Sequence, residues 1–372
     1  MPTGKNSTAN RQSPAVSRDH AQPISSHLNA SDHRSPVADH RSEKSPDVSV
    51  IIVTYNSDGQ IADCLQTLIR QRDQISQEVI VVDNNSQDKT VDIIRKQFPS
   101  VRLFTPGENL GFAKAVNFAA RQSDARYFLL LNPDTVVLDH AVDKVHAFAE
   151  QNPQYGFYGG KTLKEDGKTL ERSSCWGQPT VWSLFLFATG LSTVFRHNSV
   201  LDPESLGPWQ RDSVREVGVI TGCFLLAKRE AWQKVGGFDE HFWLYGEDVD
   251  LAMSARADGY RPVITPDAVT IHEVGQSSTS TQKMIWLHRG KVSLIKKHWT
   301  GLSRTAAFFF LKTGVAIRAL VYRLAGKSYN EWVQGWKRRT EWQNGHPSSP
   351  SSDHVPSATT LEKYTDKTNS NR

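Results

Sequence analysis

Residues 48–86 read VSVIIVTYNSDGQIADCLQTLIRQRDQISQEVIVVDNNS, and this stretch decides the fold. It opens with an almost continuous β-branched run, Val48–Thr54, which is typical of a strand buried on both faces. A polar break follows, then a helical pattern with Ile61, Leu65 and Leu68 on one face, then a second apolar run that ends at Asp83. Strand, helix and strand in this order predict a parallel sheet with right-handed crossovers.

The same alternation continues downstream. It predicts a helix near Asp88–Gln97, a strand at Val101–Phe104, a helix at Phe112–Arg121 and a strand at Tyr127–Leu131. We therefore expect an α/β fold, a Rossmann-like and mostly parallel sheet flanked by helices. In such sheets ligands bind beyond the carboxyl ends of the strands, so the residues just after each apolar run are the candidates for a site.

Small polar clusters stand at three of these strand ends. They are Thr54-Tyr55-Asn56, Asp83-Asn84-Asn85-Ser86 and Asn132-Pro133-Asp134. Each alone is compatible with an ordinary turn or helix cap, but three at one sheet edge favour a ligand site. No G-x-G-x-x-G follows the first strand and no G-x-x-x-x-G-K-[ST] occurs, so dinucleotide-dehydrogenase and P-loop interpretations lose their main support.

A second group of residues begins at Val219. An apolar strand and a helix lead to a glycine turn, an aromatic stretch, and then Glu247-Asp248 at the start of a helix. Carboxylates in the first turn of a helix are favoured by the macrodipole, so helix capping explains them. A general base requires the same ionised state near neutral pH, and both interpretations stay open at this point.

Six motifs stand in order along the chain. They are VSVIIVTYNS, EVIVVDNNSQDKT, ENLGFAKAVN, LLLNPDT, GGFDEHFWLYGEDVDL and VTIHEVGQSS. Together they resemble the family 2 glycosyltransferases of the GT-A fold, and more narrowly a bacterial rhamnosyltransferase-like branch. The resemblance spans about residues 47 to 300 and covers the C-terminal basic segment only loosely.

The resemblance implies a nucleotide-sugar donor held at the strand ends. A carboxylate at Asp83 would suit a pyrimidine N–H, because a charged acceptor makes the stronger hydrogen bond. Lys114 could neutralise phosphate, although an exposed helix lysine is the commoner situation. The residues implied for donor binding are Thr54, Tyr55, Asn56, Asp83, Asn85, Asn109, Gly111, Lys114 and Asn132.

The resemblance also implies a divalent cation, Mg²⁺ or Mn²⁺. The family's D-x-D motif is replaced here by Asn132-Pro133-Asp134, which keeps only the second carboxylate. Asp134 and His272 are the implied metal ligands, and substrate phosphates would supply further oxygens. A lone histidine at a strand end is more often structural, but an imidazole ligand would favour tolerance of Mn²⁺.

Asp248 matches the family's catalytic base, with Glu247 beside it. It would accept the proton of an acceptor hydroxyl during one displacement that inverts the anomeric configuration. The residues expected to flank the acceptor are Gly222, Cys223, Trp243 and Tyr245. The processive members' Q-x-x-R-W motif is missing from this sequence, so we expect one sugar per encounter.

Composition and charge divide the chain into four parts. Residues 1–46 and 343–372 are Ser- and Pro-rich and are predicted to be disordered tails, the first carrying histidines that could chelate a metal. Residues 47–282 are predicted to form the glycosyltransferase domain. Residues 283–342 are predicted to form a basic, amphipathic helical segment that associates with a membrane. Residues 283–340 contain 13 Lys and Arg and one acid, a local charge of +12. The rest of the chain must therefore sum to −7, because the net charge is +5.

Basic residues interleaved with tryptophan and apolar runs are typical of helices lying on anionic lipid. A solvated basic helix covering the sheet is the alternative. We expect no signal peptide and no membrane-spanning helix, because the longest strongly apolar uncharged run, Val181 to Phe195, is too short. Three cysteines outside any C-x-x-C pair indicate a reducing compartment.

The sequence thus predicts a cytoplasmic enzyme, peripheral on the inner face of a bacterial plasma membrane and active in cell-surface polysaccharide synthesis. It would move one sugar, with L-rhamnose from dTDP-L-rhamnose as the best candidate, to a glycan or polyprenyl-diphosphate-linked hydroxyl. A sugar nucleotidyltransferase is an alternative, but it would need a glycine-rich basic loop where this chain has TYNSDGQ. A nucleic-acid-binding protein is a second alternative, although we expect no nucleic acid as a partner.

Overall fold

The computed structural model describes residues 45–71, 74–272 and 280–347. The predicted tails, residues 1–46 and 343–372, lie almost wholly outside these described residues. The end of the last sequence motif, residues 273–278, lies outside them as well.

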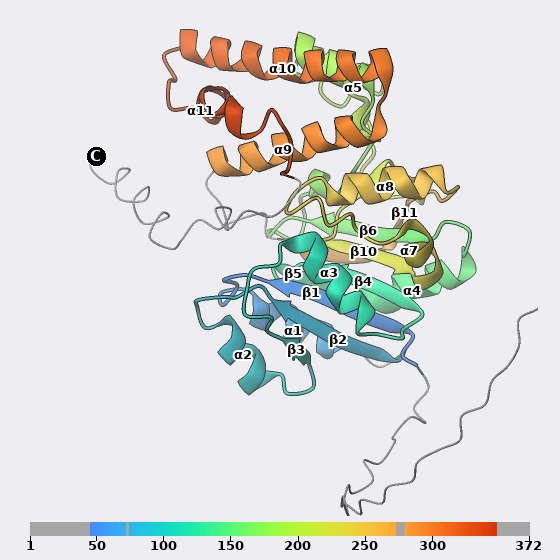
Figure 1. The fold of residues 1–372 in the computed structure, drawn as a ribbon. Helices are drawn as coiled ribbons and strands as arrows, with labels where there is room; N and C mark the ends of the chain where they lie inside the picture. The colour runs from blue at the N-terminus through green and yellow to red at the C-terminus, as the bar shows by residue number, and fades with distance from the viewer. Residues whose placement is uncertain (1–44, 72–73, 273–279, 348–372) are drawn as a thin grey trace, which may run out of the picture. The chain divides into compact units, whose positions relative to one another are not determined.

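A central sheet organises the described chain (Figure 1). Its strands are β1 (Val48–Thr54), β2 (Gln77–Asp83), β3 (Arg102–Phe104), β4 (Tyr127–Leu131), β5 (Thr135–Leu138), β6 (Phe157–Leu163), β8 (Arg215–Glu216), β10 (Phe224–Lys228) and β11 (Val263–His272). They lie in the order β3-β2-β1-β4-β10-β6-β11-β5, and β8 pairs with β11.

The sheet is parallel in its first half and mixed in its second. β3, β2, β1 and β4 are parallel neighbours, as predicted. β10 runs antiparallel to both β4 and β6, and β11 is parallel to β6 but antiparallel to β5 and β8. Only residues 132–134 separate β4 from β5, and β5 pairs with β11 and not with β4. The α/β class is confirmed, and the antiparallel strands are an addition to the predicted sheet.

Helices cover both faces of this sheet. α1 (Ile61–Ile69), α2 (Thr90–Gln97) and α4 (Ala141–Gln151) contribute to one apolar core, whereas α3 (Phe112–Arg121), α7 (Arg229–Val235) and α8 (Glu247–Ala257) contribute to the other. Successive residues of β1 alternate between the two cores, with Val50 and Ile52 in the first and Ile51 in the second. A strand covered on both sides is apolar at nearly every position, which explains the valine and isoleucine residues of β1.

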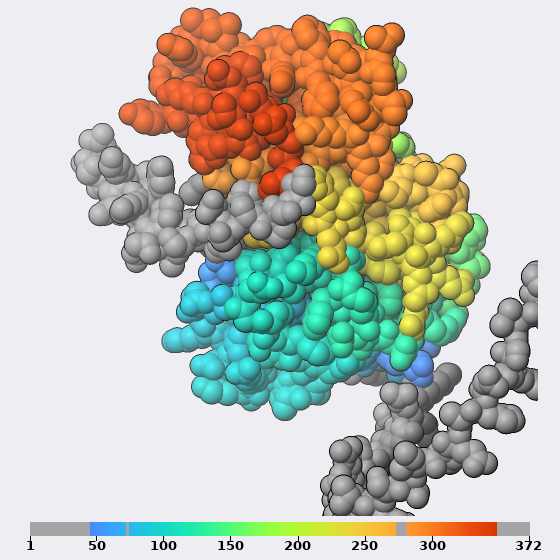
Figure 2. Space-filling view, viewed as in Figure 1, coloured from blue at the N-terminus to red at the C-terminus, as the bar shows by residue number. Residues whose placement is uncertain are grey.

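The C-terminal helices form a layer of their own beside α8 (Figures 1 and 2). They are α9 (Ser280–His298), α10 (Gly301–Leu324) and α11 (Glu331–Lys337), joined by α5 (Val181–Thr189) and the short α6 (Leu191–Val194) from the loop after β6. Leu184, Ile285, Leu311 and Trp342 belong to their common apolar core. A short ribbon of β7 (Cys175–Trp176) and β9 (Val219–Ile220) leads back to the main sheet.

Several cations of this basic segment make contacts inside the protein. The Lys297 ammonium lies 2.7 Å from Asp239 and 2.9 Å from Asp250. The Arg318 guanidinium lies 3.8 Å from the centre of the Phe187 ring and donates a 2.7 Å hydrogen bond to the Phe187 carbonyl. The positive charge of residues 283–340 is therefore not all available to an external anion.

Candidate active site

Side chains at the ends of β1 and β2 meet at one edge of the sheet. The Thr54 hydroxyl donates a 2.9 Å hydrogen bond to Asp83 Oδ1. Ser86 also donates to this carboxylate, through its hydroxyl to Oδ1 (2.5 Å) and its amide to Oδ2 (2.9 Å). Two carboxylate oxygens offer about four acceptor positions, so one remains on Oδ2. Asp83 is 2% exposed; it ties two loops together and keeps one position for a further donor.

The loops after β1 and β2 are also joined through Asn56. Its amide donates to Ser86 Oγ (2.9 Å), and its side-chain oxygen accepts from the Gln87 amide (2.8 Å). Asn56 and Asn85 have φ values of 51° and 64°, a left-handed conformation that asparagine adopts more readily than most residues. Both are exposed and Tyr55 is half-buried. The loops therefore hold a fixed shape at the predicted donor edge.

The turn before α3 is fixed by two asparagine side chains. Asn84 donates to the Gly111 carbonyl and accepts from the Leu110 amide, both at 3.2 Å, and Asn109 accepts from the Gly111 amide at 2.9 Å. Gly111 has a φ of 77°, and a Cβ there would lie 2.6 Å from Cδ1 of Trp243. Both the conformation and the close approach require glycine at this position.

The register of β5 with β11 brings the predicted metal ligands together. His272 is opposite Thr135, so its Nε2 lies 3.1 Å from Asp134 Oδ1 and 3.2 Å from Asn132 Nδ2. Asp134 Oδ1 is buried and makes no hydrogen bond within the described structure, because the approach of His272 lacks hydrogen-bond geometry. A buried carboxylate oxygen without a donor, beside an imidazole nitrogen, fits a divalent cation.

These residues do not form a complete cage for a metal ion. Within the described ranges, no group of three or more His, Cys, Asp or Glu side chains converges. Further ligands would have to be the Asn132 amide oxygen, water or substrate phosphate, which is how cations that bind nucleotides are usually held.

The start of α8 holds the predicted base. The Gly222 amide donates a 3.1 Å hydrogen bond to Asp248 Oδ1. Burial raises the pKa of Asp248 to about 7, and the bond from Gly222 opposes that rise. Because this hydrogen-bond partner lies in the β9–β10 loop and not in the first turn of α8, helix capping alone does not explain the carboxylate.

Glu247 differs from its neighbour in burial. Its side chain is buried, and Oε2 makes no hydrogen bond in the described structure. Burial, and then the charge of Asp248, raise the pKa of Glu247 well above its ordinary value. Burial therefore favours the protonated form of Glu247, and Asp248 is the carboxyl group of the pair that accepts the hydrogen bond from Gly222.

Backbone contacts connect the three groups of residues. The Asn132 amide donates to the Cys223 carbonyl (3.3 Å), next to Gly222. A Cβ on Gly222 would lie 3.0 Å from the ring of Phe112, and the Phe112 amide donates to the Trp243 carbonyl (3.0 Å). The candidate donor, metal and base residues thus lie along one connected rim.

The residues predicted to flank the acceptor lie in different environments. Trp243 is half-buried, with its ring centre 5.7 Å from that of Trp286 in α9. Tyr245 has a φ of 64° in the loop before α8. Burial raises the pKa of Cys223 to about 12, so its thiol is neutral and unsuited to nucleophilic attack. Lys114 is exposed on α3, as an ordinary helix lysine would be.

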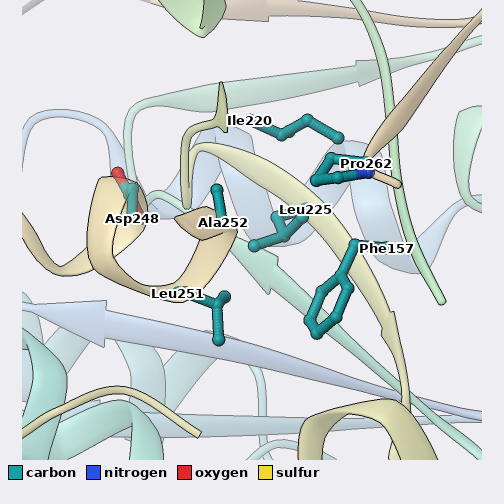
Figure 3. Close-up of a pocket in the computed structure, with 7 residues that line it drawn as sticks. All are labelled: Phe157, Ile220, Leu225, Asp248, Leu251, Ala252 and Pro262. Carbon is teal, nitrogen blue, oxygen red and sulfur yellow. The ribbon is translucent and has the colours of Figure 1, made fainter. Parts of the chain in front are cut away.

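Cavity size does not identify the substrate cleft. Figure 3 shows Asp248 on α8 together with the apolar residues that line the same cavity. The volume of this cavity is about 10 Å³. This space suits about one water molecule, and its apolar walls account for the desolvation of Asp248. A larger hollow of about 850 Å³ lies between α3 and α7 and contains none of the predicted site residues.

Sequence reasoning overlooked three residues that organise this region. Asn84 and Ser86, rather than Asn85, direct their side chains into the loop contacts. Asp250 is buried and pairs with His298 (2.7 Å) and Lys297 (2.9 Å) of α9. The available signal was a third carboxylate in the first turn of α8, but its partners lie nearly 50 residues away along the chain.

Comparison with known proteins gives the class: the chain is a glycosyltransferase. The model of Glycosyl transferase family 2 matches residues 49–202, which include the ends of β1, β2 and β4. The chain therefore carries a family 2 glycosyltransferase domain. The family resemblance drawn from the sequence motifs is confirmed over these residues.

Two named relatives and one solved structure are similar to this chain. An N-acetylglucosaminyl-diphospho-decaprenol L-rhamnosyltransferase of Mycobacterium tuberculosis is 27% identical over 289 residues, which cover 73% of this chain and 91% of that protein. An O-antigen biosynthesis protein of Myxococcus xanthus is 28% identical over 62% of this chain and 18% of its own length. The solved mannosyltransferase of Pyrobaculum calidifontis in complex with GDP-Man and Mn²⁺ covers 80% of this chain and 85% of its own, at 18% identity and a TM-score of 0.48.

Proposed function

We propose that this chain is an inverting glycosyltransferase that moves one sugar from a nucleotide-sugar donor to a hydroxyl of a glycan or lipid-linked acceptor. The observation that carries the proposal is the hydrogen bond from Gly222 to Asp248. It holds an ionisable carboxylate against Gly222, and a Cβ on Gly222 would also meet the ring of Phe112, directly after the Gly111 turn. A base with a pKa of about 7 at this place suits deprotonation of an acceptor hydroxyl.

The proposed reaction is a single displacement. The acceptor oxygen attacks the anomeric carbon, its proton passes to Asp248, and the bond from carbon to the diphosphate oxygen breaks with its electron pair leaving on the nucleotide diphosphate. Burial raises the pKa of Glu247 well above its ordinary value, which disfavours Glu247 as a second carboxylate nucleophile beside Asp248. That difference favours one displacement with inversion over two displacements through a covalent intermediate.

The donor would lie against the loops after β1 and β2. The remaining acceptor position on Asp83 suits the ring N–H of a thymine or uracil base. Asp134 and His272 would hold a divalent cation, Mg²⁺ or Mn²⁺, whose charge would offset that of the departing diphosphate. L-rhamnose from dTDP-L-rhamnose is our candidate donor, because the relative from Mycobacterium tuberculosis is named an L-rhamnosyltransferase.

The acceptor is proposed to be membrane-linked. The same relative is named for a decaprenol-linked substrate, and decaprenol is a polyisoprenoid lipid. We place the enzyme on the inner face of a bacterial plasma membrane, where it would meet anionic lipid and no nucleic acid. This location also accounts for the cationic and apolar character of α9 to α11.

Thermal-shift screening against dTDP-, UDP- and GDP-sugars with Mg²⁺ or Mn²⁺ tests the donor, and transfer to a synthetic GlcNAc-diphosphate lipid tests the reaction. We expect the largest metal-dependent shift with dTDP-L-rhamnose and label transferred to the lipid. Formation of a nucleotide sugar from a sugar phosphate and a nucleoside triphosphate would instead identify a nucleotidyltransferase. Tight DNA binding that falls steeply with salt, without transfer, would identify a nucleic-acid-binding protein.

A further inference from the structure

The outer face of α10 is apolar. Its opposite side, with Leu311 and Val315, packs into the core shared with α5, α9 and α11. Side chains spaced three, four, seven or eight residues apart share one side of a helix. Along the outer side, this spacing aligns exposed large apolar residues: Leu302, Phe309, Ile317, Leu320, Val321 and Leu324. Leu302 is 90% exposed and Leu324 is 78% exposed, so no described part of the chain covers either end of this face.

Aromatic contacts extend this face onto α5. Phe309 lies 5.7 Å from Phe310, Phe310 lies 5.4 Å from Phe185, and Phe185 stacks on Trp182 at 5.3 Å, as measured between ring centres. Trp182 is 49% exposed. The apolar surface therefore continues from one helix to the next, and an extended exposed apolar surface marks an interaction site. We call the six exposed α10 residues together with Trp182 the docking face.

Charge indicates what covers the docking face. Lys312 and Arg323 are both exposed and stand eleven residues apart, about three helical turns, so they lie on one edge of it. Residues 283–330 contain no Asp or Glu. An apolar face with a purely cationic edge is complementary to anionic lipid. A second copy of the chain would bring the same cations against it, with like-charge repulsion.

The position of Lys312 also indicates how α10 meets the lipid. Among the described residues, α10 is the one helix that is long and apolar enough to cross a membrane, although 28% of its apolar window is buried inside the protein. Lys312 is exposed at the middle of its 24 residues. A spanning orientation would put this ammonium at the centre of the bilayer, where charges are costly, whereas an in-plane orientation puts it among the headgroups.

We propose that the docking face lies in the plane of an anionic membrane surface, with its apolar side chains inserted among the acyl chains and Lys312 and Arg323 at the phosphates. The inference rests on the proposed function, because a lipid-linked acceptor is what brings this enzyme to a membrane. It assigns membrane binding to α10 and α5. Lys297 and Arg318 are not counted among the lipid-binding cations, because both already make contacts within the protein.

Flotation with phosphatidylglycerol-containing vesicles tests the docking face. The double substitution Phe309→Gln with Leu320→Gln alters two exposed side chains, so the fold should persist, and vesicle partitioning should fall by at least about tenfold. The control Val214→Gln replaces a residue of similar exposure (51%) near β8 and should float like the wild type. Circular dichroism and thermal unfolding check the fold of each variant.

A second pair of variants isolates the charge. Lys312→Gln with Arg323→Gln should lower partitioning onto anionic vesicles by about tenfold or more at low salt, and should leave partitioning onto neutral vesicles unchanged. The control Lys96→Gln removes an exposed cation from α2 and should have no effect. In both docking variants, transfer to a lipid-linked acceptor should fall while transfer to a water-soluble acceptor stays at the wild-type rate.

Three results would overturn the inference. One is unchanged flotation of the Phe309→Gln, Leu320→Gln variant. Another is a wild-type protein that resists extraction from membranes at alkaline pH, as a spanning helix does. The third is a dimer that these substitutions dissociate without changing vesicle binding, which would make the face an interface between copies. Absence of transfer from every nucleotide sugar, with flotation intact, would refute the proposed function and leave the docking face standing.

Discussion

Replacing Asp248 with asparagine should abolish most activity and, above neutral pH, stabilise the fold. The asparagine side chain keeps the shape of the carboxylate, and its oxygen can still accept the hydrogen bond from Gly222. It cannot accept the proton of an acceptor hydroxyl. General-base groups contribute about 10² to 10⁴ in rate, so we expect kcat to fall by about that factor while donor affinity changes within a few-fold.

The stability effect follows from the raised pKa of Asp248. Burial raises this pKa from 3.8 to about 7, so ionisation is harder in the folded state, and stability is lost as pH rises from about 4 to about 7. The difference between the two values is worth up to about 4 kcal/mol. Asp248 is only half-buried, so solvent screens part of this effect. We therefore expect Asp248→Asn to raise the free energy of unfolding by about 1 to 2 kcal/mol at pH 8. That gain corresponds to roughly 2 to 8 °C in Tm, and it should vanish near pH 4.

Differential scanning fluorimetry from pH 4 to 8.5 and steady-state kinetics measure the two effects on the same samples. Wild-type kcat/KM should rise with pH around the pKa of about 7. Glu247→Gln is the matched control: it replaces a neighbouring carboxyl whose raised pKa disfavours its charged form, so activity should stay within about tenfold. Turnover near the wild-type rate in Asp248→Asn would place the base elsewhere. Parallel stability profiles of Asp248→Asn and wild type would show that the Asp248 carboxyl is not desolvated.

Three further substitutions test the surrounding contacts. Asp134→Ala should weaken metal-dependent donor binding more than His272→Ala does, because the carboxylate is the charged ligand; full activity of EDTA-treated wild type would contradict the metal assignment. Gly111→Ala should lower the free energy of unfolding by about 1 to 3 kcal/mol in urea titrations, because its Cβ would lie 2.6 Å from Trp243. An unchanged urea midpoint would show that Gly111 and Trp243 are not in such close contact. Asp250→Asn should lower the free energy of unfolding by about 2 kcal/mol, because it removes the negative charge that pairs with Lys297 and His298 of α9. An unchanged free energy of unfolding would show that this contact between α8 and α9 is dispensable.

The parallel half of the sheet could be predicted from local pattern. β1 is apolar at nearly every position because it is covered on both faces, and β1, β2 and β4 each end in a polar cluster. The antiparallel half could not be predicted in this way. β9 has two residues, and the partners of β11 come from β5, β6 and β8, so these pairings depend on contacts between distant segments.

The candidate site was predictable where residues stand at element ends. Thr54 and Asp83 end their strands, and Asp248 opens its helix. Within the cluster after β2, the sequence does not reveal that Asn84 turns inward while Asn85 faces solvent, because this depends on the left-handed backbone at residue 85. His272 was implied by family resemblance, and its position beside the metal candidate follows from strand register.

The central claim, a single displacement with Asp248 as base, is tested most directly by the anomeric configuration of the first product. Proton NMR of the running reaction, with the nucleotide sugar that gives the largest thermal shift, reads this configuration before it can change. We expect a product of opposite configuration to the donor, formed by the wild type and lost in Asp248→Asn. A product that retains the donor's configuration would contradict the inverting displacement proposed for this site.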